Sequence, residues 1–183
     1  MIKMMPIGPL MIEHRLIERV IASMRADIQR FERSGVAEPV LVDRYANFIH
    51  MYADRCHHGK EEDILFRELR GKSLTPALSS ILEELLEDHA LGRRLTGQLV
   101  DANQRYAAGD ASALPEILDP MRTLVEFYPR HIEKEDKHFF IPAMDCFSPQ
   151  EQEAMLQEGF ALDRGLIHQL YREFADALEE RAI

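Results

Sequence analysis

Residues 56–66 read CHHGKEEDILF, and this stretch decides how the rest of the chain can fold. His57 and Glu61 are four residues apart, and so are His58 and Glu62. In an α-helix that spacing places both members of a pair on one face, one turn apart. His57 shares its face with apolar residues such as Ile64, so we expect this histidine and its carboxylate to point toward a core.

The rest of the chain repeats its apolar residues with the period of a helix. We expect long amphipathic helices over roughly 9–34, 40–70, 75–107 and 113–141, a fifth from 148 to about 180, and no strand. Short breaks such as RSGVAEP (33–39) imply antiparallel neighbours. The sequence therefore predicts an all-α fold in a single domain, 1–183, with an up-down-up-down four-helix bundle at 7–142 and an additional C-terminal helix at 148–181.

The C-terminal helix is expected to begin with the capping box SPQE (148–151) and to carry an apolar stripe that must be buried. The stripe consists of Met155, Phe160, Leu162, Leu166 and Leu170. It predicts either packing across the bundle or a homodimer formed through this helix.

Composition narrows the classes of partner and compartment. The 183 residues carry a net charge of −10, which disfavours nucleic acid and anionic membrane surfaces as partners. No apolar run reaches the roughly 18 residues of a spanning helix, and no signal peptide is expected. Two cysteines do not make a disulfide framework, so we expect a cytoplasmic protein.

Each of the four bundle helices carries one histidine near mid-length on its apolar face, and two of these histidines have a glutamate four residues later. The residues are His14, His57 with Glu61, His89, and His131 with Glu135. A buried carboxylate costs several kcal/mol unless it is compensated, and metal coordination compensates it. Such a set exceeds the needs of one tetrahedral zinc and suits two octahedral ions with positions left open for a small ligand.

At this point the sequence resembles the hemerythrin-like (HHE cation-binding) family over roughly residues 7–142. The resemblance lies in EHRLIERVI (13–21), HHGKEEDILF (57–66), LLEDHALGRRL (85–95) and HIEKEDKHFFIP (131–142). It implies a four-helix bundle that holds two non-haem iron ions, bridged by an oxide or hydroxide, with zinc or nickel as substitutes in recombinant protein. The implied ligands are His14, His57, Glu61, His89, His131 and Glu135.

Two details of the implied ligand set depend on helix geometry. Counting back four residues from the first acid selects His57, and at about 100° per residue His58 turns away, so His58 and Glu62 are expected beside the centre. On the fourth helix the family's carriers use a spacing of five, so Asp136 competes with Glu135, which we favour because four residues align better.

Arg93 marks a departure from the family. The oxygen-carrying members have a fifth histidine four residues after the third-helix histidine, and here Arg93 occupies that place after His89. The sequence therefore predicts a centre with one nitrogen fewer. His138 is a candidate extra ligand or a surface residue, and His168 a candidate cap of the site or a structural residue.

The resemblance implies a protein that binds or senses dioxygen, nitric oxide or peroxide. An alternative is a di-iron enzyme that breaks down peroxide, or donates iron and repairs iron–sulfur clusters, under oxidative or nitrosative stress. A helical interaction module without metal is a further alternative.

Overall fold

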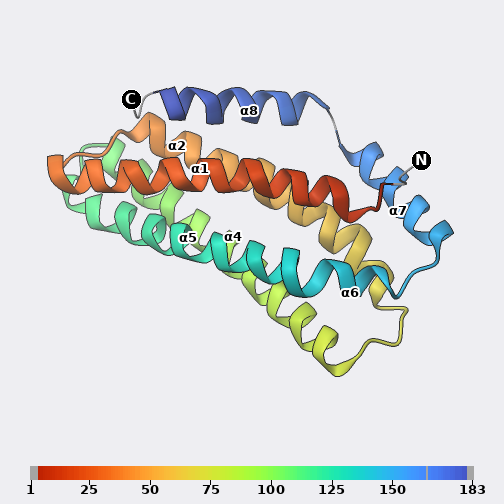
Figure 1. The fold of residues 1–183 in the computed structure, drawn as a ribbon. Helices are drawn as coiled ribbons and strands as arrows, with labels where there is room; N and C mark the ends of the chain where they lie inside the picture. Colours follow the sequence, from red (N-terminus) through yellow and green to blue (C-terminus); the bar gives the residue numbers. More distant parts are fainter. Residues whose placement is uncertain (1–3, 164, 181–183) are drawn as a thin grey trace.

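The computed structural model describes residues 4–163 and 165–180, without the side chains of residues 165–170. Helices make up nearly all of this part, and no strand occurs in it (Figure 1). The first bundle segment is α1 (Ile7–Ser34), and the second joins α2 (Pro39–Phe48), the π-helices η1 (Ile49–His58) and η2 (Glu61–Phe66), and α3 (Arg67–Leu69). The third is α4 (Pro76–Ala107), and the fourth joins the 3-10 turn η3 (Ala111–Ala113), α5 (Leu114–Lys134), the π-helix η4 (Glu135–Phe139) and α6 (Phe140–Met144). The predicted all-α four-helix bundle is confirmed.

The ends of the long helices have recognisable causes in the sequence. Gly35 ends α1 with a left-handed φ of 68°, a conformation that costs glycine little. Thr75 begins α4 by accepting a hydrogen bond from the Leu78 N–H at 3.2 Å. Ser148 and Glu151 form the predicted capping box at the start of α7 (Pro149–Leu162).

The chain beyond the bundle forms two helices, α7 and α8 (Gly165–Glu180), where the sequence predicted one. Asp163 ends α7 with extended backbone angles, and this break moves the buried face. Met155 is buried as expected, but Phe160 and Leu162 are 47% and 53% exposed, so the predicted continuous stripe is wrong for these two residues. The side chains of residues 166 and 170, which completed the stripe, lie outside the described part.

Helix α8 lies along α1 and η1 of its own chain (Figure 1). It buries Tyr171, Ala175 and Leu178 in the bundle core, and the Tyr171 hydroxyl donates to the side-chain oxygen of Asn47. The described part of its apolar face therefore packs within the chain, and a homodimer through the C-terminal helix stays a prediction.

The apolar core consists of two clusters with the histidines between them. On α1, Leu10 before His14 belongs to one cluster and Ile17 after it to the other. The same division falls around His89, with Leu85 on one side and Leu95 on the other. The same division between the two clusters occurs on the second and fourth helical segments. The bundle thus encloses one polar layer at mid-length, shielded from water at both ends.

Candidate metal centre

The six residues predicted from the sequence meet in this polar layer, although they come from four different helical segments. None is more than 2% exposed. They are His14 on α1, His57 on η1, Glu61 on η2, His89 on α4, His131 on α5 and Glu135 on η4. Ionisable side chains so deeply buried need compensating partners.

Four of these side chains gather their inner atoms in one group. His14 Nε2 lies 2.9 Å from His57 Nε2 and 3.1 Å from Glu135 Oε2. His57 Nε2 lies 3.5 Å from Glu61 Oε1. Metal–ligand bonds of about 2.1 Å at right angles put neighbouring donor atoms about 3.0 Å apart. The four donors are therefore spaced to hold one ion.

A second group lies beside the first and shares its carboxylates. His89 Nε2 is 3.4 Å from Glu61 Oε2 and 3.8 Å from Glu135 Oε1, and His131 Nε2 is 3.3 Å from the same Glu135 oxygen. Each glutamate thus turns one oxygen to each group. That is the arrangement in which a carboxylate bridges two ions.

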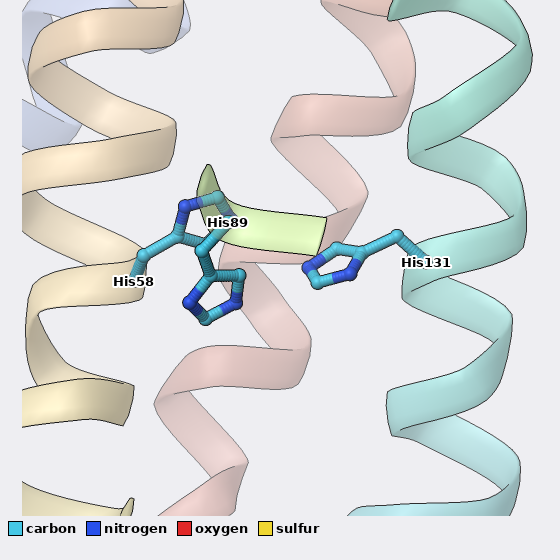
Figure 2. A group of neighbouring side chains, drawn as sticks. All are labelled: His58, His89 and His131. Carbon is cyan, nitrogen blue, oxygen red and sulfur yellow. The ribbon is translucent and has the colours of Figure 1, made fainter. Parts of the chain in front are cut away.

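His58 joins the second group, which the sequence did not predict. Its ring stacks on that of His89 with centroids 3.9 Å apart, and its centroid is 5.4 Å from that of His131. Figure 2 shows the three imidazoles facing one another from three different helices. The expectation that His58 turns away is wrong because η1 is π-helical, so the backbone advances fewer degrees per residue than an α-helix. The two adjacent histidines at 57 and 58 were the feature of the sequence that could have indicated a second histidine ligand on this helix.

Several buried polar atoms of this cluster lack hydrogen-bond partners within the described residues. They are both nitrogens of His58, Nε2 of His89 and of His131, and both oxygens of Glu61 and of Glu135. Buried polar atoms are nearly always paired, and each unpaired one costs free energy. Metal ions satisfy nitrogen and carboxylate donors together, so the residues present fit a metal site.

Four outer carboxylates fix the orientation of four of the imidazoles through Nδ1. The pairs are His14 with Asp136 at 2.8 Å, His57 with Glu13 at 3.0 Å, His89 with Glu62 at 2.7 Å and His131 with Asp88 at 3.2 Å. Such partners leave Nε2 free for a metal and are typical of metal-binding histidines. Asp136, the alternative to Glu135, therefore contacts the far side of His14 and not the cluster interior.

Each outer carboxylate also contacts a cation. The pairs are Glu13 with Lys60, Glu62 with Arg93, Asp88 with Lys134 and Asp136 with Arg15. Arg93 additionally donates to Asp54 at 2.7 Å. Lys and Arg side chains thus compensate the negative charge of the outer carboxylates. No such cation contacts Glu61 or Glu135 among the described residues, so their charge is available to a cation bound inside the cluster.

The same contacts set the pKa values of the histidines. Burial alone would lower the pKa of His14, but the hydrogen bond to Asp136 and the adjacent Glu135 carboxylate outweigh it and raise the pKa to about 10. Burial is likewise outweighed at His89, where the neighbouring carboxylates of Glu135, Glu61 and Glu62 raise the pKa to about 11. Burial, with neighbouring His89, holds the pKa of His58 well below its ordinary value. Protons therefore occupy part of the cluster until a metal displaces them.

The remaining histidines lie away from the cluster or outside the described side chains. His50 and His138 are exposed, which leaves His138 as a surface residue. The side chain of His168 is outside the described part. Cys56, next to His57, is half-buried, and burial raises its thiol pKa to about 11, so it stays protonated at neutral pH.

Within residues 4–163 and 165–180, no helix combines the length and the apolar character needed to cross a bilayer.

Comparison with known proteins identifies a family. Residues 5–141 match the hemerythrin HHE cation binding domain. Uncharacterized proteins of Mycobacterium tuberculosis and Mycobacterium bovis are 25% identical over 142 residues, which cover 78% of this chain and 54% of each relative. The chain thus spans about half the length of these curated relatives, and no solved structure matches it. From the match over most of its length, the chain belongs to the hemerythrin HHE cation-binding family.

Proposed function

We propose that the cluster holds two iron ions and that the protein binds or senses a small ligand such as dioxygen, nitric oxide or peroxide. The observation that carries the proposal is the convergence of seven buried side chains, five of which have polar atoms without a hydrogen-bond partner among the described residues. His14 and His57 would hold one ion, and His58, His89 and His131 the other. Glu61 and Glu135 would bridge the two.

The number of donors supports a centre that still accepts a ligand. Five imidazole nitrogens and two bridging carboxylates fill about nine of the twelve positions of two octahedral ions. A bridging oxide or hydroxide would fill two more, so one position stays open. His58 would thus supply the fifth nitrogen, which the sequence predicted to be missing because Arg93 stands four residues after His89.

Bound iron would supply reversible ligand binding and one-electron chemistry at that open position. Peroxide breakdown, the enzymatic alternative, would use the same position. Iron donation is less favoured, because the donors are fully buried and four of the five histidines are fixed by outer carboxylates. Such a cage favours retention of the metal over its release.

The test is metal content per chain after growth in iron-supplemented medium, together with an ultraviolet–visible spectrum. We expect about two irons and oxo-bridged charge-transfer bands, and loss of both in the double variant His57→Ala, His131→Ala. His138→Ala, which removes an exposed histidine, is the matched control and should keep its iron. A folded wild-type protein of normal stability without metal would refute the proposal.

A further inference from the structure

A groove with a volume of about 590 Å³ runs along the seam between the α2–η1 segment and α4. Asn47, His50 and Asp101 line it toward the surface. His58, Gly92 and Tyr128, all buried, line its deep end. The groove therefore leads from solvent to the side of the cluster on which His58 lies.

The hydroxyl of Tyr128 is an unused donor at that deep end. The side chain is 1% exposed, and its oxygen has no hydrogen-bond partner within the described residues. Its ring centroid lies 6.5 Å from that of His131, edge to face. A phenol keeps its proton at neutral pH, since its ordinary pKa is about 10, so this hydroxyl can donate to a molecule in the groove.

Two glycines on α4 line the same groove. Neither the backbone conformation nor a lack of space for a side chain requires glycine at these two positions. Gly92 and Gly97 both have ordinary helical backbone angles. A Cβ atom at Gly97 would meet nothing within 4 Å, and one at Gly92 would meet Phe127 at 3.8 Å and the Tyr128 oxygen at 4.0 Å, which are ordinary contacts. Glycine inside a helix is less stable than alanine. What the missing side chains provide is an open groove.

We propose that this groove is the passage by which a small ligand reaches the metal centre, and that Tyr128 donates the hydrogen bond that holds it there. The ligand class is a molecule of two or three heavy atoms with an acceptor atom at its free end. This inference rests on the proposed function, because the ligand needs a metal to bind. Tyr128 acts as a positioning residue beside His58 and His131.

Binding of azide to the iron-loaded protein tests both parts. We expect Gly97→Leu, at the surface end, to slow azide association and dissociation about tenfold or more, and so to leave the dissociation constant nearly unchanged. Ala90→Leu, an exposed position on α4 away from the groove, is the control and should bind as the wild type does. Equal association rates in the two variants would overturn the passage.

Tyr128→Phe should leave association unchanged, speed azide dissociation about tenfold and shift the azide charge-transfer band, because one hydrogen bond to a charged ligand is lost. An unchanged band and dissociation rate would overturn the role of Tyr128. Iron per chain is measured in the same samples. Absence of iron in the wild type would refute the proposed function, and the ligand role of the groove would fall with it.

A measurement on the metal-free protein separates the groove from a packing role. Gly92→Ala should raise the thermal midpoint by about 1–4 °C, as expected for glycine-to-alanine in a helix of a protein of this size. A lower midpoint would show that Gly92 is required for packing, and would overturn our reason for its presence. This readout does not depend on which metal the centre holds.

Discussion

Removal of the Asp136 carboxylate should weaken metal binding without abolishing it. Asp136 contacts His14 Nδ1 at 2.8 Å, whereas the His14 Nε2 atom faces Glu135 and the cluster. In Asp136→Ala the imidazole keeps its place in the core but loses the partner that fixes its orientation. Loss of such an outer partner typically costs 10–100-fold in metal affinity, or about 1.4–2.7 kcal/mol.

The ion held by His14 should feel this change most. The second group contains neither His14 nor any residue that Asp136 contacts. At saturating metal we therefore expect Asp136→Ala to bind two ions per chain. Glu135→Ala should bind fewer, because the bridging oxygens would be lost from both groups.

Competition with a chromophoric chelator gives the affinities, and elemental analysis gives the number of ions per chain. Asp119→Ala is the control, since Asp119 is a largely exposed carboxylate paired with Arg122 far along α5. An Asp136→Ala protein that loses an ion even at saturation would make Asp136 a ligand. A Glu135→Ala protein that keeps both ions would refute the assignment of Glu135.

Three further outcomes follow from the same geometry. His58→Ala should leave about one tightly bound ion per chain, while His50→Ala, at the exposed surface, should leave two; equal metal content in both would exclude His58 as a ligand. In the metal-free fold the pKa values of His14 and His89 are raised to about 10 and 11. The two protonated histidines therefore stabilise the fold fully below about pH 6.5, and this stabilisation is lost as the pH rises toward the raised pKa values. The denaturant midpoint of the metal-free protein should fall over that pH range. Calorimetry in buffers of different ionisation enthalpy should detect about two protons released per chain on metal binding near pH 7. Release of no proton would contradict the raised pKa values. Phe66→Ala should cost about 3–5 kcal/mol of unfolding free energy in denaturant titrations, since Phe66 is fully buried and stacks on His89, and a cost below about 1 kcal/mol would mean that the core collapses around the gap.

The part of the fold that the sequence predicted is the part that follows helical periodicity. The first, second and third helical segments end close to the expected residues, because local sequence signals mark the breaks between them. Gly35 caps the end of α1, and Thr75-Pro76 begins α4. The histidines at equal depth followed from the same period. The break at Asp163 was not predicted from periodicity. No proline marks it, and Gly159 and Gly165 on either side of it are also compatible with one continuous helix.

His58 escaped prediction for a related reason. An α-helix turns 100° per residue, whereas η1 is π-helical and turns less, so His58 lies on a different face from the one that α-helical periodicity predicts. Glu62 was expected beside the centre, but the histidine with which each outer carboxylate pairs was not predicted. Glu62 stands next to Glu61 in the sequence, but its partner His89 belongs to another helix, and that pairing exists only in the folded bundle.

The outer carboxylates form a closed circuit around the bundle, and this circuit couples the two halves of the centre. Each outer carboxylate stands next to a cluster residue in the sequence and contacts a histidine on another helical segment. Glu13, next to His14, contacts His57, and Glu62, next to Glu61, contacts His89. Asp88, next to His89, contacts His131, and Asp136, next to Glu135, contacts His14. A helix that shifts to bind one ion therefore re-aims a donor on the next helix as well. Ordering the first ion would pre-organise the second, so loading of the centre should be cooperative.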